Sequence, residues 1–395
     1  MMDGRVSNRM AQRKDGGVPV LDRAGGARRL RHGDEELVYI GDAFERSHVE
    51  ALNGKPYPVE WRRQGAEEAW SRALGETHLW RRWSASGTSC AAIRDEMLWQ
   101  LDRNFPVAEH GDPVTLRNSQ THIANQISVN LLYCLHKGTV IEATPALESL
   151  LANSDVDLSL PMSMVAPPYA AQYLHFGELA MCHLTPPAST MPGHVFDGAF
   201  CFFGPRADAP GRWRLELILI SKRGDRYSGQ ITLAGETDRG DTSLGQWMEW
   251  VLGAADGRLD DDCREAMHAV VSYLVKLFLY MGLKNARRVE RNDRDDVLKR
   301  AKGLGERKRD RLLKRTASLY NAILVGPETL PAQATSCGGG SAVAPHWRRG
   351  HFRMQPCGPG WQERKLIFVA PVLIHADRLQ DELPAPKAYC ADARL

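Results

Sequence analysis

The sequence has no paired cysteines and no apolar leader. None of the eight cysteines forms a CxxC pair, and the N-terminus has no apolar segment of the kind found in signal peptides. These absences argue against a zinc ribbon and against secretion, so we expect a reduced, cytoplasmic protein. The sequence also lacks the P-loop, GxSxG, HExxH and dinucleotide-binding motifs. This favours a binding protein without a cofactor over an enzyme.

Long apolar runs are also missing. The most apolar segment covers residues 263–283, where His268 and Lys276 interrupt it and leave two pieces of seven residues. A bilayer core needs about 20 apolar residues in succession, so the segment predicts a buried central helix and no membrane span. The aspartates at residues 260–262 precede it and suit the N-terminal end of a helix.

Composition and charge are those of a globular protein with an uneven charge distribution. Hydrophobic residues make up 43% and charged residues 25% of the 395 residues, which excludes collagen-like, disulfide-rich and wholly disordered classes. A chain of this length is expected to form more than one domain. Residues 284–365 carry a net charge of +11, whereas the rest of the chain carries −8. The basic part is therefore where we expect the chain to meet a polyanion.

Apolar spacing predicts an N-terminal helical layer. Segments 66–74 and 91–101 place apolar residues three and four positions apart, as amphipathic helices do. Five tryptophans in this part of the chain are expected to anchor its core, although such residues also stack on bases. They are Trp61, Trp70, Trp80, Trp83 and Trp99.

A change of pattern after residue 160 predicts an antiparallel sheet. Three segments between residues 199 and 234 have strand length and are separated by turn residues. Leu215, Leu217 and Leu219 share one face of the middle segment with Trp213, whereas Arg214 and Glu216 lie on the other. The fold class is therefore α+β. It has a helical N-terminal layer, a central antiparallel sheet packed on a long buried helix, and a small C-terminal β-hairpin unit.

These patterns divide the chain into four parts. The third part contains 14 Lys/Arg and 6 Asp/Glu between residues 284 and 315, so it is either a solvated helical arm or a phosphate-contacting one. The parts are a disordered basic tail (1–34), an α+β body (35–283), a charged helical arm with a Gly/Pro-rich linker (284–340), and a basic β-hairpin unit with a tail (341–395).

The C-terminal unit holds the candidate contact residues. A Gly-Pro-Gly turn at residues 358–360 separates two segments of strand length, which predicts a β-hairpin. Guanidinium groups suit phosphates and exposed aromatic rings suit bases, so we interpret the hairpin as a nucleic-acid-binding surface. The alternative is that the aromatic residues belong to the core and the arginines pair with acidic groups of the body. The candidates are Arg348, Arg349, Arg353, Lys365, Trp347 and Phe352.

Two histidines in the same unit allow further hypotheses. His346 and His351 could act as the acid and base of a metal-free ribonuclease. Their separation of five residues directs them to opposite faces of a strand unless Gly350 forms a bulge. Together with Cys337 and Cys357 they could ligate zinc, but the spacings match no common zinc framework. The histidines are therefore weak catalytic candidates, and we expect no metal.

The run from Pro345 to Phe352, Pro-His-Trp-Arg-Arg-Gly-His-Phe, resembles the C-terminal signature of a family of phage and plasmid proteins that includes a type V-A anti-CRISPR protein. The order of the upstream parts is also similar, over roughly residues 36–376. The resemblance implies a cytoplasmic protein of a mobile genetic element. Such a protein would recognise the nascent N-terminal peptide of a type V-A CRISPR effector nuclease during translation and lower its mRNA and protein.

The implied partners are the nascent polypeptide of that effector or of another host protein, with the ribosome or mRNA as a second contact and no membrane. A function of a different class stays open beside this one. The same basic hairpin fits a nucleic-acid-binding maintenance or regulatory protein of a plasmid or phage. An enzyme is expected only under the ribonuclease hypothesis.

Overall fold

The structure is a computed structural model that describes most of the chain between residues 30 and 374. Residues 30–32 of the predicted tail form strand β1 (Leu30–His32), which pairs antiparallel with β2 (Glu35–Leu37). The rest of the tail, most of the predicted linker and the C-terminal tail lie outside the described residues. The described ranges are 30–32, 35–38, 40–47, 49–51, 54–75, 77–84, 88–105, 113–188, 191–206, 209, 211–237, 242–253, 261–330 and 346–374.

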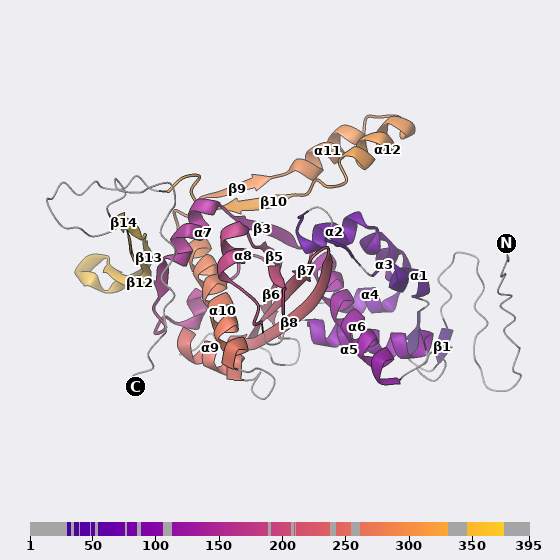
Figure 1. Cartoon of the computed structure of the whole chain (residues 1–395), viewed down its shortest axis with the longest axis horizontal. Coiled ribbons are helices and arrows are strands. Elements are labelled where there is room, and N and C mark those ends of the chain that lie inside the picture. Colours follow the sequence, from indigo (N-terminus) through magenta and orange to yellow (C-terminus); the bar gives the residue numbers. More distant parts are fainter. Residues whose placement is uncertain are drawn as a thin grey trace, which may run out of the picture.

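A seven-stranded sheet forms the centre of the molecule, with strand order β8-β7-β6-β5-β3-β10-β9 (Figure 1). The prediction of antiparallel strands is confirmed for β6 to β8, and β5 also pairs antiparallel with β6. The sheet as a whole is mixed, because β3 runs parallel to both β5 and β10. The strands are β3 (Thr139–Ala143), β5 (Ala171–His175), β6 (Val195–Pro205), β7 (Trp213–Arg223), β8 (Arg226–Thr237), β9 (Arg288–Arg291) and β10 (Ala322–Val325).

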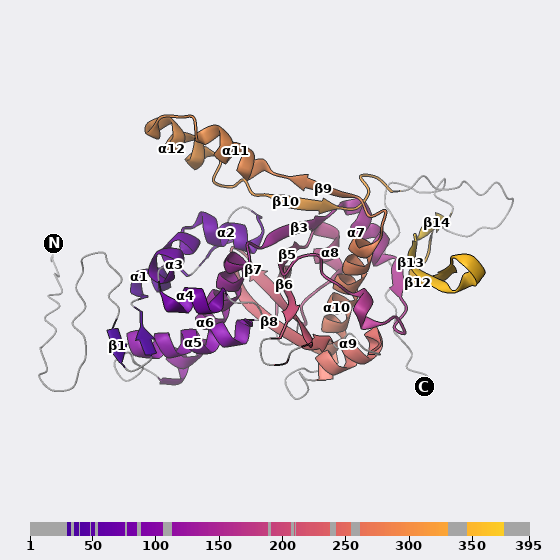
Figure 2. The same ribbon diagram turned by 180° about the vertical axis from the view of Figure 1, so that it is seen from behind.

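Helices cover both faces of this sheet, as Figures 1 and 2 show from opposite sides. Leu215, Leu217 and Leu219 of β7 share one face, as predicted, and pack with the helices that follow β3. Ile218 and Ile220 point the other way and pack with the N-terminal helices. Alternate side chains of this one strand therefore belong to two separate apolar clusters, one on each side of the sheet.

The N-terminal layer is helical, as the apolar spacing predicted. Trp61, Trp70 and Trp83 are buried and confirm the predicted core role, whereas Trp80 and Trp99 are half-buried. The layer contains α1 (Gly41–Glu45), α2 (Tyr57–Arg63), α3 (Ala66–Leu74), α4 (His78–Trp83), α5 (Cys90–Asn104) and α6 (Pro113–Leu135).

The opposite layer is built around the predicted central helix. Helix α10 (Asp261–Gly282) is buried over most of its length because apolar side chains lie on nearly every side of it. Across the part of the chain that the structure describes, no helix is long and apolar enough to cross a membrane. The other helices of this layer are α7 (Pro145–Ala152), α8 (Glu178–His183) and α9 (Leu244–Gly253).

The basic third of the chain begins with an arm that is only partly helical. Helices α11 (Asp293–Ala301) and α12 (Glu306–Arg315) lie between β9 and β10, which form the last two strands of the sheet. The interpretation of this segment as helical missed both strands, because each has only four residues and three of the four in β9 are charged. In Figures 1 and 2 the two helices project from the sheet edge away from the body.

Candidate functional site

The C-terminal unit forms the β-hairpin that the sequence predicted, and we call residues 346–374 the cationic ribbon. Strands β12 (Gly350–Cys357) and β13 (Glu363–Val369) pair antiparallel around a short 3-10 turn at Pro359–Trp361. Gly358 and Gly360 have φ values of 74° and 62°, a backbone conformation that glycine adopts at little cost. β11 (His346–Arg348) and β14 (Val372–Ile374) form a second ladder beside the hairpin.

The ribbon is attached to the body through a strand that the sequence did not predict. β12 pairs in parallel with β4 (Ser154–Val156), and the Gly350 amide donates a hydrogen bond to the Asn153 carbonyl oxygen at 3.0 Å. A Cβ atom on Gly350 would lie 2.6 Å from Pro371 and from the Ser154 hydroxyl oxygen. Glycine at this position therefore permits the close approach of the ribbon to the body.

Phe352 belongs to the core, so its predicted role as a base-stacking residue is wrong. Its side chain is fully buried and stacks on Phe368 with ring centroids 4.5 Å apart. Phe368 in turn meets Tyr280 of α10 edge to face at 6.1 Å. The alternation of β12 turns Phe352 towards α10, and an apolar ring is more stable there than in water.

The opposite face of the hairpin presents cations to solvent. Arg353 and Gln355 alternate with the inward residues of β12, and their partners across the ladder are Ile367 and Lys365. Arg353 and Lys365 are exposed, and Arg348 on β11 is exposed as well. The structure therefore brings these three predicted contact residues to the surface of one small unit.

Arg349 and Trp347 are placed differently from the exposed cations. Arg349 is half-buried, and its guanidinium donates to the Asp155 carboxylate at 2.5 Å. This pair matches the alternative in which arginines of the ribbon meet acidic groups of the body. Trp347 is half-buried and pairs with Leu373 in the β11–β14 ladder. These two residues hold the ribbon in place and offer less surface to a ligand than the exposed cations do.

A buried lysine braces the body side of this attachment. The Lys276 ammonium group donates hydrogen bonds to the carbonyl oxygens of Leu151 and Ser154 at 2.7 and 2.9 Å. Burial lowers the pKa of Lys276 to about 8, Asp155 opposes that shift, and Arg349 adds to it. In the sequence, Lys276 is notable only because it interrupts an apolar run. In the structure it links α10 to the turn between α7 and β4.

The two histidines lie on strands of different sheets. His346 is opposite Ile374 on β11, and His351 lies on β12 between Val369 and Asp155. Both side chains are half-buried. Cys337, the first member of the hypothetical zinc set, lies outside the described residues, and the described residues contain no cluster of ligands suited to a metal ion. The strand is interrupted at Arg349, between β11 and β12 and next to Gly350, the residue at which the sequence allowed a bulge.

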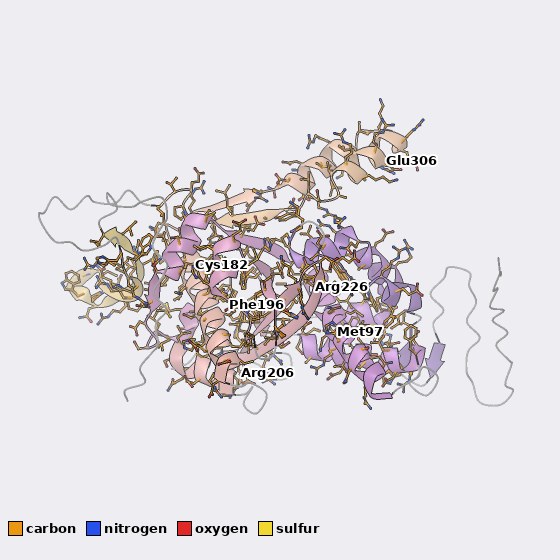
Figure 3. The ribbon with its side chains drawn as sticks, in the orientation of Figure 1. Met97, Cys182, Phe196, Arg206, Arg226 and Glu306 are labelled. Carbon is orange, nitrogen blue, oxygen red and sulfur yellow. The ribbon has the colours of Figure 1, made fainter. Side chains whose placement is uncertain are left out.

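A cleft that the sequence did not predict lies beside the end of β6 and the start of β7. It has a volume of about 880 Å³ and opens between α5, α6 and the loop before β5. Arg206, labelled in Figure 3, is one of its polar residues. The proline pair at residues 167–168 and the aromatic residues at the strand ends were the available signal. The aromatic side chains that line it are Tyr169, Phe202, Phe203 and Trp213.

One carboxylate inside this cleft is held in a fixed position. Glu216 is 4% exposed, accepts a hydrogen bond from the Cys90 amide at 3.2 Å, and pairs with Arg214 at 2.7 Å. The Cys90 amide belongs to the first turn of α5, where backbone N–H groups lack helical partners. The cleft therefore combines aromatic walls with a few oriented polar groups, which is typical of a binding site for a small or extended ligand.

Together, these features define an α+β protein with an aromatic-lined cleft beside β6 and β7 and with projecting cationic elements. The family model described as AcrVA2-like, the Anti-CRISPR type V subtype A2 family, matches residues 141–376. The chain belongs to this family. The matched segment runs from β3 to the end of the cationic ribbon and leaves the N-terminal helical layer outside.

A solved structure described as the crystal structure of AcrVA2 is similar to this chain with a TM-score of 0.44 and 12% sequence identity. The similarity covers 81% of this chain and 100% of that one. No curated protein matches the sequence.

Proposed function

We propose that this chain lowers the production of a type V-A CRISPR effector nuclease by recognising the nascent N-terminal peptide of the nuclease during translation. Loss of the effector mRNA follows from that recognition, and the protein acts by binding without attacking the assembled nuclease. Membership of the type V subtype A2 anti-CRISPR family, established over residues 141–376, is the observation that carries this proposal.

The cleft beside β6 and β7 supports the peptide-binding part. An extended peptide needs pockets for side chains and polar groups for its backbone. Phe203 and Trp213 provide adjoining aromatic walls, with ring centroids 4.9 Å apart, and Glu216 provides an oriented polar group. A volume of about 880 Å³ holds a few residues of an extended chain.

The proposal is tested by co-expressing the chain with a type V-A effector and measuring effector mRNA and protein. We expect both to fall. Trp213→Ala in the cleft should abolish the effect and weaken binding of a synthetic peptide with the N-terminal sequence of the effector. Trp250→Ala is the matched control, because Trp250 is 49% exposed on α9 and does not line the cleft. Unchanged effector mRNA with the parent protein would refute the proposal.

A nucleic-acid-binding maintenance or regulatory protein is the second candidate, and the exposed cations of the ribbon favour it. Arg353→Glu with Lys365→Glu should then reduce retention on heparin and the affinity for RNA or DNA, without loss of fold. This pair is a sharper test than one that includes Arg349, whose ion pair with Asp155 is part of the ribbon attachment. Absence of any nucleic-acid binding at low salt would remove this candidate. The ribonuclease hypothesis remains a prediction, tested by metal-free RNA cleavage with His351→Ala.

A further inference from the structure

The arm between β9 and β10 separates its charges along its length. We call residues 299–315 the arm tip. The tip contains nine Lys/Arg and two Asp/Glu. Three aspartates lie instead in the first turn of α11, next to the body. Their negative charges there interact favourably with the positive end of the helix dipole. Glu306, labelled in Figure 3, marks the outer end of the arm. The net positive charge is therefore concentrated in the end of α11 and in α12, whereas the three aspartates lie at the start of α11.

The base of the arm is fixed by hydrogen bonds to the body and to itself. The Asn321 side-chain oxygen accepts from the amides of Arg294 and Asp295 at 3.1 and 3.2 Å, so the residue before β10 caps the start of α11. Tyr320 donates to the Glu142 carboxylate of β3 at 2.5 Å, and Arg62 of α2 donates to the Leu319 carbonyl oxygen at 3.2 Å. These contacts fix the base of the arm against the body.

Helix α12 has one apolar face and one cationic face. Leu312 and Leu313 are half-buried, and α12 contacts α11. At 100° per residue, Arg307, Arg311 and Lys314 lie within about 60° of one another on the side opposite the leucines. All three are exposed, and none makes an ion pair within the described residues. The helix therefore presents a continuous cationic stripe to solvent.

The chemistry of this stripe fits a phosphate backbone better than the other polyanionic surfaces. A membrane-bound helix needs an exposed apolar face, whereas Leu312 and Leu313 of α12 are half-buried. The core of a protein interface is depleted of charge and enriched in aromatic anchors, and the described residues of the arm tip contain no aromatic residue. Guanidinium and ammonium groups spaced one helical turn apart are well suited to successive phosphates.

We propose that the arm tip binds RNA through phosphate contacts made by Arg307, Arg311 and Lys314. The choice of RNA over DNA rests on the proposed co-translational function, because RNA is the nucleic acid next to a nascent chain. The arm would thus supply an RNA contact that is separate from the cationic ribbon and from the peptide cleft.

The first test measures binding of the full chain to a short RNA hairpin by fluorescence anisotropy, at salt concentrations from about 50 to 200 mM. Each phosphate contact contributes about 0.9 to the slope of log affinity against log salt concentration. One contact therefore raises the affinity about eightfold at 0.1 M salt relative to 1 M salt. The variant R307Q/R311Q/K314Q should therefore bind about 500-fold more weakly at 0.1 M salt, with a slope lower by roughly 3. A matched variant removes three exposed cations of the helical layer and should bind like the parent. Its substitutions are R46Q, R72Q and R81Q.

Three outcomes would overturn the proposal. The first is equal RNA affinity of the parent and the arm variant. The second is tighter binding of the parent to a DNA hairpin of the same sequence, or to polyglutamate, than to RNA. The third is recovery of DNA in place of RNA when the parent is crosslinked in cells that express the effector.

The peptide assay separates this proposal from the proposed function. If the arm variant loses RNA but still binds the effector peptide, the arm proposal is supported whatever happens to effector mRNA. If the parent binds RNA through the arm but neither binds the peptide nor lowers effector mRNA, the proposed function fails and the arm proposal stands. If effector mRNA falls equally with the parent and the arm variant, and their RNA affinities agree, only the arm proposal fails.

Discussion

Truncation of Phe352 would test whether the cationic ribbon is an integral part of the fold. The Phe352 ring is fully buried and stacks on Phe368, which contacts Tyr280 of the central helix. Replacing a buried phenylalanine by alanine costs about 3–5 kcal/mol through lost transfer free energy and the cavity left behind. The ribbon lies at the edge of the core and can relax into part of that cavity, so we expect about 3 kcal/mol.

This loss should appear as local opening of the ribbon, because Phe352 and Leu373 are its residues in the buried hydrophobic core and Met354, Leu366 and Phe368 are only partly buried. A cost of about 3 kcal/mol corresponds to a roughly 100-fold faster amide exchange in the affected segment. Hydrogen exchange with mass spectrometry on Phe352→Ala should therefore show faster exchange in residues 346–374 and little change in α10. Phe352→Leu conserves more volume and should cost less than about 1.5 kcal/mol.

The control is Trp361→Ala, since Trp361 is 71% exposed at the hairpin turn. We expect this substitution to change stability by less than about 0.5 kcal/mol. If Phe352→Ala altered exchange no more than Trp361→Ala and instead weakened RNA binding, the Phe352 ring would be a contact residue, and the assignment of Phe352 to the core would be refuted.

Three further predictions concern the attachments of the ribbon and the arm. The pKa of Lys276 is about 8 in the folded chain, whereas its ordinary value is 10.5. Between these pH values the unfolded chain binds more protons at Lys276 than the folded chain does, so the unfolding free energy rises with pH. The unfolding free energy of the parent relative to Lys276→Met should therefore rise by about 2 kcal/mol between pH 8 and 10 in urea titrations; a flat difference would contradict the burial of this charge. Gly350→Ala should destabilise β12 by about 1–3 kcal/mol, because the new Cβ meets Pro371, and unchanged hydrogen exchange in β12 would count against the tight contact. Asn321→Ala removes the cap of α11 and should cost about 1 kcal/mol, seen as roughly fivefold faster exchange in α11 with the body unaffected; equal protection would exclude the capping role.

Several elements could be predicted because their signals are local. The apolar character of residues 263–283 and the preceding aspartates predicted α10, and the leucine alternation in β7 predicted a strand with two distinct faces. The Gly-Pro-Gly turn predicted the ribbon hairpin, since glycine adopts positive φ at residues 358 and 360. Each of these signals is contained in a few consecutive residues.

The cleft and the strands of the arm could not be predicted in this way. β9 and β10 are short, and β10 becomes part of the sheet only because it lies parallel to β3, far earlier in the chain. Glu216 reads as an exposed strand residue in the sequence, but it is buried because α5 covers that end of β7 and supplies the Cys90 amide. Such positions depend on a partner that the local sequence does not contain.

The sequence by itself determined the helical layer, the central helix, the hairpin and the concentration of positive charge after residue 284. Only the tertiary structure decided which of those charges face solvent. Arg349 is paired because Asp155, 194 residues earlier, is brought beside it by the β4–β12 pairing, while Arg353 on the same ribbon stays exposed. Periodicity and turn chemistry act between neighbours in the chain. Burial and ion pairing are set by residues that only the fold brings together.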